Sequence, residues 1–238
     1  MADRPGHDGS LRAVYRILPR RNVAPAMGNS VGVTHDGRRL WLLSSNEVQH
    51  VLYELDEATS TPLRAHPLPA LIGAQGTSAH GIAWVDGAIW IATAGTTNEL
   101  VQVDPDTGRI LRRLSAPTEL GPTGLSFDGQ HLWLSSTTGH VYRVSTQNGG
   151  IEQRFLAGSA EVRSQGVAHR AGEIWVAGLF EQMVVYSSRD GALLGAVTTE
   201  GGAHLPREDL GQLCFVGDEL VVLSQRGLTY YRPERVAE

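Results

Sequence analysis

Short apolar runs alternate with turn residues along the whole chain, and one arrangement of them returns five times. The clearest copy is GIAWVDGAIW at residues 81–90, where two apolar runs flank an Asp-Gly pair. Asp-Gly between two such runs predicts a β-hairpin. The other copies are GVTHDGRRLW from Gly32, GLSFDGQHLW from Gly124, GVAHRAGEIW from Gly166 and a divergent QLCFVGDELV from Gln212. The sequence therefore predicts five hairpins of one kind.

The hairpins recur at the spacing of a β-propeller blade. Positions 32, 81, 124, 166 and 212, the anchors, are separated by 49, 43, 42 and 46 residues, which is the period of such a blade. A third apolar run follows each hairpin, at 51–55, 100–103, 141–144, 183–186 and 228–231. Turns rich in Gly, Pro, Asp and Asn then lead to a fourth run. We expect one all-β domain over residues 1–238, a five-bladed β-propeller of four-stranded antiparallel blades.

The last blade needs a strand from elsewhere in the chain. Pro233 follows the third run of the fifth copy and only a few residues remain, so this copy lacks a fourth strand. The segment 11–18 precedes the first hairpin and resembles the fourth-strand segment 109–114. We expect this N-terminal strand to complete the fifth blade and close the ring, which would remove an unpaired edge. No window has a helical period, so no helix is predicted.

Tryptophans mark the second strand of the first four hairpins at a fixed place. They are Trp41, Trp90, Trp133 and Trp175, and Val221 takes this place in the fifth copy. One large aromatic residue per repeat predicts packing between neighbouring blades rather than a ligand site.

Composition and charge exclude several classes of function. The net charge of −5 comes with no basic cluster, which argues against nucleic-acid binding. All 20 basic residues are arginines, so mechanisms that use a Schiff-base, PLP or P-loop lysine are excluded. Cys214 is the single cysteine, so neither an intramolecular disulfide nor a Cys-rich metal site can form. We expect a cytoplasmic protein that is not associated with a membrane, and a monomer because ring closure leaves no free edge.

The candidate site lies at one mouth of the central channel. The residue before each anchor should lie nearest the axis, and these residues are Val31, His80, Thr123, Gln165 and Gly211. Of these, His80 titrates near neutral pH. Loops between second and third strands should converge on the same mouth, and they contribute Asn46, Glu47, Asn98, Glu181 and Arg226.

These residue types suit acid/base chemistry on a small molecule. We predict that His80 moves a proton and Glu181 orients it, while Asn46, Glu47, Asn98, Gln165 and Arg226 bind the substrate. The plainer interpretation of His80 is a water-bound channel histidine. No organic cofactor is expected. A divalent metal held by Glu47, His80 and Glu181 is an alternative.

The repeats resemble those of a broad group of propeller enzymes. The carrying segments are GPTGLSFDG at 121–129 with HLWL at 131–134, and ELVQVDPDTGRI at 99–110. They are similar to streptogramin B (virginiamycin B) lyases, SMP-30-like lactonases and five-bladed glutaminyl cyclases. The lyases look seven-bladed, whereas five repeats are present here, and no catalytic motif of these families can be laid on the chain. The resemblance implies small-molecule chemistry by proton transfer: elimination, ring opening or ring closure.

Three functions remain open from the sequence. The first is a lyase or cyclase that acts by general acid/base proton transfer on a small polar or peptide-like molecule. The second is a non-catalytic propeller that binds a ligand or a protein partner at the same mouth. The third is an architectural subunit of a larger assembly.

Overall fold

Twenty strands and two short 3-10 helices make up the described part of a computed structural model of the chain, which covers residues 12–23, 29–46, 49–71, 78–117, 121–157, 164–178 and 182–236. The chain begins with β1 (Ala13–Val23). Three repeat units follow, each a four-stranded antiparallel sheet in chain order. Unit 1 is β2 (Ser30–His35), β3 (Leu40–Ser45), β4 (His50–Leu55) and β5 (Pro62–Pro67). Unit 2 is β6 (Ser78–Val85), β7 (Ala88–Ala94), β8 (Glu99–Val103) and β9 (Ile110–Ser115). Unit 3 is β10 (Pro122–Phe127), β11 (His131–Ser136), β12 (His140–Ser145) and β13 (Ile151–Leu156).

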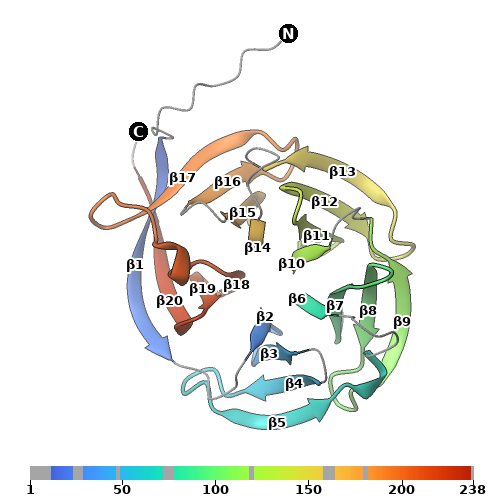
Figure 1. The fold of residues 1–238 in the computed structure, drawn as a ribbon. Coiled ribbons are helices and arrows are strands. Elements are labelled where there is room, and N and C mark those ends of the chain that lie inside the picture. Colours follow the sequence, from blue (N-terminus) through green and yellow to red (C-terminus); the bar gives the residue numbers. More distant parts are fainter. Residues whose placement is uncertain are drawn as a thin grey trace.

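The remaining strands form one eight-stranded sheet. Unit 4 contributes β14 (Ser164–Arg170), β15 (Glu173–Gly178), β16 (Met183–Ser187) and β17 (Leu193–Thr199). Unit 5 contributes β18 (Gln212–Val216), β19 (Glu219–Ser224) and β20 (Gly227–Arg235), together with β1. The order is β14-β15-β16-β17-β1-β20-β19-β18. The fold is therefore all-β and propeller-like, with its strands arranged around a centre (Figure 1).

The number of sheets differs from the prediction of five separate blades. There are four sheets, because β1 pairs on both of its edges: antiparallel with β20 and, over Ala13–Ile17, parallel with β17. The close approach to β17 depends on Gly195, whose φ is +150° and where an added Cβ would lie 2.4 Å from the carbonyl oxygen of Arg12. One strand thus joins the outer edges of units 4 and 5.

The N-terminal strand pairs where the sequence predicted, with different bounds. It runs from Ala13 to Val23 rather than over 11–18, and Leu11 lies outside the described residues. Pro19 pairs with Tyr231 and Val23 with Leu228. Pro233 does not end β20, since residues 232–235 pair with β1 alone and its missing N–H falls on the unpaired side.

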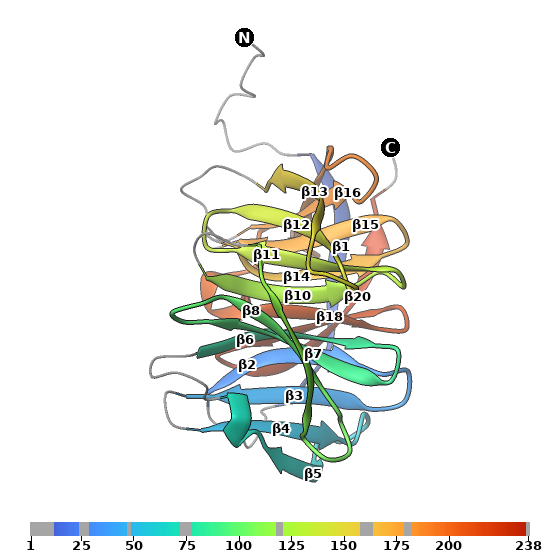
Figure 2. The ribbon, with the colours of Figure 1, turned by 90° about the vertical axis from the view of Figure 1, so that its right-hand side faces the viewer.

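The inner strands β2, β6, β10, β14 and β18 surround the axis and the outer strands form the rim (Figure 1). Glycine at the anchors lets neighbouring inner strands touch through their backbones. An added Cβ on Gly81 would lie 2.4 Å from Leu125 N, and one on Gly166 would lie 2.3 Å from Gly211 O. These contacts put the anchors at one level, so all inner strands start at the same end of the ring, which we call the mouth. Figure 2 shows the layered units from the side.

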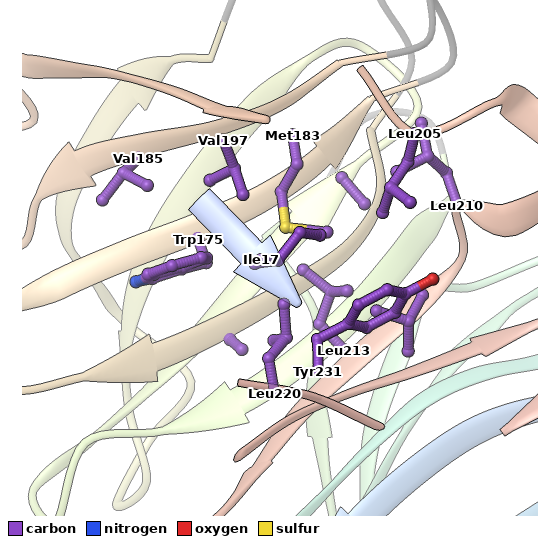
Figure 3. Packing of buried hydrophobic residues seen from close by; sticks show 13 residues of the cluster. Ile17, Trp175, Met183, Val185, Val197, Leu205, Leu210, Leu213, Leu220 and Tyr231 are labelled. Atoms are coloured by element: carbon purple, nitrogen blue, oxygen red, sulfur yellow. The ribbon is translucent and has the colours of Figure 1, made fainter. Parts of the chain in front are cut away.

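A hydrophobic cluster fills the space between each pair of consecutive units, as the tryptophans predicted. Trp41, Trp90, Trp133 and Trp175 are buried in four of these clusters. Val221 and Cys214 lie in the fifth cluster, between units 5 and 1. Figure 3 shows the cluster between units 4 and 5, where Ile17 of β1 packs with Trp175, Met183 and Tyr231. Burial raises the pKa of the Cys214 thiol, which is a core residue.

In the described residues, the helical content is limited to two single turns, η1 (Pro69–Leu71) and η2 (Arg207–Asp209). No α-helix occurs in the described ranges, in agreement with the prediction. Within those ranges, no helix has the length and apolar character needed to cross a membrane.

Candidate functional site

A β-bulge at the mouth end distinguishes the inner strands of units 1 to 4. In each, one extra residue breaks the register just before the anchor, between Ser30 and Gly32, Ala79 and Ile82, Pro122 and Gly124, or Ser164 and Gly166. The extra residues are Val31, His80, Thr123 and Gln165, with the His80 bulge extending to Gly81. A bulge re-aims the side chain that it inserts. The residues that the sequence singled out for the mouth are therefore those inserted by bulges.

His80 is half-buried in its bulge and bonds to a hydroxyl. Its Nε2 lies 2.9 Å from Ser78 Oγ, and Ser78 also donates to the carbonyl oxygen of Ala94 at 3.5 Å. The imidazole tautomer sets the donor in the 2.9 Å contact: Nε2 either donates to Ser78 Oγ or accepts its proton, and the other ring nitrogen takes the opposite role. Burial lowers the pKa of His80 below its ordinary value. The imidazole is therefore neutral at pH 7 and can accept a proton.

Gln212 of β18 reaches across the axis. It stands where the other four units have the anchor glycine, and its Nε2 donates to Thr123 O of β10 and to Gln165 O of β14. Both acceptors are carbonyls of bulge residues. The Gln212 carboxamide therefore occupies the axis at the level of the bulges and ties unit 5 to units 3 and 4.

We call the Gln212 carboxamide with its two hydrogen bonds the brace. A chain of hydrogen-bonded hydroxyls lies beside it. Thr123 Oγ1 is 3.0 Å from Ser135 Oγ and 3.3 Å from Ser164 Oγ, and Ser164 Oγ donates to Ser136 O at 2.9 Å. Since Ser164 uses its proton on the carbonyl, Thr123 donates to Ser164 and Ser135 donates to Thr123. The serines are fully buried, so this chain fixes the Thr123 side chain from below.

Arg226, which was predicted to bind substrate, forms ion pairs with two carboxylates of the protein. Its Nη1 lies 3.2 Å from Asp209 and its Nη2 lies 3.0 Å from Glu208, both in η2. The guanidinium ties the connection between β19 and β20 to the segment that leads into β18. Two carboxylates thus pair with its single positive charge.

Of the other predicted residues, three lie in the described ranges and two lie outside them. Asn46 and Asn98 lie in connections between second and third strands, at the mouth end of units 1 and 2. Asn46 Oδ1 accepts the Gln49 N–H at 2.6 Å, which shapes the turn, and Asn98 O accepts the Ala116 N–H at 2.8 Å. Gln165 contributes its carbonyl to Gln212. Glu47 and Glu181 lie outside the described residues.

A buried Ser–His pair lies under the strand that carries His80. Ser45 Oγ is 2.7 Å from His50 Nδ1 and accepts the N–H of Ala79, the residue before His80, at 3.3 Å. His50 is 1% exposed and its Nε2 has no hydrogen-bond partner. Burial lowers the pKa of His50. This pair connects the end of β3 to the start of β6.

No group of three His, Cys, Asp or Glu residues suited to a metal ion occurs within the described ranges. Of the predicted set Glu47, His80 and Glu181, only His80 belongs to those ranges. His131 pairs with Glu152 at 2.9 Å at the turn end of unit 3, whereas His140 lies at its mouth end beside Thr138. These two histidines are at opposite ends of the unit.

Sequence reasoning missed Ser78 and Gln212. A signal for Gln212 was available, since it is the single polar residue at an anchor where every other copy has glycine. Ser78 lies two residues before His80 on the same strand, at the separation that puts side chains on one face of a regular strand.

No protein-family model matches this chain, and no curated protein is significantly similar to it. Among solved structures, glutaminyl cyclase from Myxococcus xanthus is similar over 95% of this chain and 100% of its own, with a TM-score of 0.71 and 14% identity. Two structures of AztD from Citrobacter koseri, one of them apo, match 75% of this chain and 49% of theirs, with TM-scores of 0.47 and 14% identity. The first likeness supports a propeller-like fold with four-stranded sheets.

Proposed function

We propose that this chain is a cyclase-type enzyme that transfers protons at the mouth of a five-bladed propeller, with His80 as the general base. In this proposal the eight-stranded sheet counts as two blades, β14–β17 and β18–β20 with β1, joined by the β1–β17 pairing. The observation that carries the proposal is His80 itself. It is a bulge residue at the mouth, and burial lowers its pKa so that it is neutral near pH 7.

The similarity to a glutaminyl cyclase suggests which ring closure to test. When a glutaminyl residue cyclises, its free amino nitrogen attacks the side-chain carboxamide carbon. A new C–N bond forms, the old C–N bond breaks and ammonia leaves. One base can take the proton from the attacking nitrogen and return it to the departing one, so neither water nor an oxidant is consumed. In this proposal the unprotonated ring nitrogen of His80 performs both transfers.

A histidine variant and a matched control test the assignment. A peptide with N-terminal glutamine is incubated with the protein, and ammonia release and the mass of the peptide are measured. His80→Ala should lower kcat by about a hundredfold or more, with an unchanged melting temperature. His140→Ala changes another mouth-end histidine and should leave kcat within a few-fold. Equal activity of wild type and His80→Ala would remove His80 from the mechanism.

The pH profile gives a second test of the base. Because burial lowers the pKa of His80, kcat/KM should stay high at neutral pH and fall only below the ordinary histidine value of about 6.5. A limb centred above pH 7 would identify a different group.

The second candidate function is a non-catalytic ligand-binding propeller. It is favoured by the partner of His80, which among the described residues is the Ser78 hydroxyl rather than a carboxylate. A binder would be stabilised against heat by the same peptide without releasing ammonia.

A further inference from the structure

We call the Gln212 carboxamide, together with the bulge residues Thr123 and Gln165 that it binds, the floor of the mouth. We infer that this floor selects ligands that donate N–H groups, and that Gln212 Oε1 is a specificity-determining acceptor there. The inference rests on the proposed function, because it names the substrate class of the same mouth: a small molecule with a free amine or amide N–H. It follows from where the polar protons of the Gln212 carboxamide and of the hydroxyls beside it are already used.

The Gln212 carboxamide has one possible orientation. Its nitrogen faces two carbonyl oxygens, those of Thr123 and Gln165. Exchanging its nitrogen and oxygen would set Oε1 against both carbonyls with no proton between them. Both amide protons are therefore used within the protein, and the unused hydrogen-bonding capacity of the head group is that of an acceptor.

The hydroxyls next to this brace have no proton left to offer. Ser135 donates to Thr123, Thr123 to Ser164, and Ser164 to the Ser136 carbonyl. Each proton is used inside the chain. His80 Nε2 lies 2.9 Å from Ser78 Oγ, and in either tautomer the neutral imidazole has one ring nitrogen without a proton.

The acceptors of Gln212 and His80 belong to adjoining backbone. An added Cβ on Gly81, which follows His80, would lie 2.5 Å from Gly124 Cα, and Gly124 follows Thr123, whose carbonyl binds Gln212. Arg226, which was predicted to bind substrate, is already paired with Glu208 and Asp209. Gln212 and the hydroxyls beside it therefore offer lone pairs, which fit an amine or amide ligand better than an anion.

The test uses glutaminyl-glycine amide as the probe and its Nα-acetyl derivative as the matched control. In ¹H–¹⁵N spectra of the full chain, the side-chain NH₂ pair of Gln212 is assigned as the pair that Gln212→Met removes. We expect the free-amine probe to shift this pair saturably. The acetylated probe, which lacks the amine, should bind about tenfold more weakly or worse.

Two substitutions remove the acceptor together with the brace. Gln212→Met removes both and Gln212→Gly restores the glycine of the other units, and each should raise Kd for the free-amine probe by about tenfold or more. Equal binding of the two probes, binding unchanged in both variants, or no binding to wild type would each overturn the inference. Should a variant fail to fold, the comparison of the two probes on wild type decides alone.

The outcomes for function and for specificity can be distinguished. Saturable shifts of the Gln212 pair without ammonia release would support the inference while refuting the cyclase proposal. Ammonia release with the KM of the wild type in both Gln212 variants would support the cyclase proposal while overturning the inference.

Discussion

The carboxylate at the hairpin turn of units 1 and 3 has two tasks. Asp36 Oδ1 accepts backbone N–H groups of its turn and its Oδ2 accepts the Trp41 indole N–H at 2.8 Å. Asp128 makes the same bonds, with Trp133 at 2.8 Å. Burial acts to raise the pKa of each carboxyl, but these hydrogen bonds outweigh burial and lower it. The turn is thereby fastened to the core between units.

Unit 2 lacks this bond, which gives a matched pair of variants. Its two-residue turn puts Asp86 four rather than five residues before the tryptophan, and the buried Trp90 Nε1 has no partner. Trp133→Phe should therefore cost about 2 kcal/mol more stability than Trp90→Phe, since only the former breaks a hydrogen bond to a charged group. Denaturant unfolding of both variants measures the difference, and equal losses would contradict this account.

The buried His50 predicts a loss of stability in mild acid. Its folded pKa is lowered, so the unfolded chain binds the proton more readily and stability falls as the pH drops below about 6.5 toward the folded pKa. His50→Asn keeps a polar group near Ser45 and removes the titration. It should flatten the slope of stability against pH below 6.5 by at most about 1.4 kcal/mol per pH unit. Chemical denaturation from pH 8 to 5 measures the slopes, and parallel curves would refute the prediction.

At the residue scale, the sequence predicts where a residue lies better than it predicts the hydrogen-bond partner of that residue. The tryptophans Trp41, Trp90, Trp133 and Trp175 are buried, as their recurrence once per repeat implied. The partner of His80 could not be read, because a bulge re-aims that side chain and the sequence does not give the direction. The brace by Gln212 joins positions 47 and 89 residues apart, a contact that only ring closure creates.

At the element scale, the anchor glycines are required by close approach between inner strands. Gly166→Ala would bring a Cβ to 2.3 Å from the Gly211 carbonyl, where backbone must move. We expect a loss of about 1–3 kcal/mol or more. Gly201→Ala is the control, because nothing lies within 4 Å of its Cβ position. Thermal unfolding of both variants checks the contrast, and a Gly166→Ala variant as stable as the control would show that the strands are not in backbone contact.

Most elements of units 1 to 4 could be predicted because hairpin, third strand and turn repeat locally. The predicted third strands 51–55, 100–103, 141–144 and 183–186 lie within β4, β8, β12 and β16. The pairing of β1 with β17 could not be predicted, since the repeat pattern supplies a partner for only one edge of a rim strand. It depends on Gly195, an inconspicuous glycine that admits the backbone of β1.

At the scale of the whole molecule, β1 holds the two ends of the ring together. Ile17 is fully buried among residues of units 4 and 5. Arg21 stacks on Tyr230 of β20 at 3.7 Å and donates to the carbonyls of Glu57 and Ala58 in unit 1. One strand therefore contacts units 4, 5 and 1, and its removal should expose apolar surface on all three.

The ring needs β1 for its position in space and not for its position in the sequence. A variant in which β1 is moved to the other end of the chain tests this. Val236 N donates to Val14 O at 3.0 Å, so the end of β20 lies beside the start of β1 and a short turn can join them. A circular permutant running from residue 27 to 236, through a Gly-rich turn into 12–26, should fold with a melting temperature within about 4 °C of wild type. The chain 27–236 without β1 should lose its cooperative transition, because Trp175 and Tyr231 lose the cover of Ile17. Calorimetry compares the three proteins; a cooperative transition of the shortened chain at the temperature of wild type would mean that the ring closes without this strand.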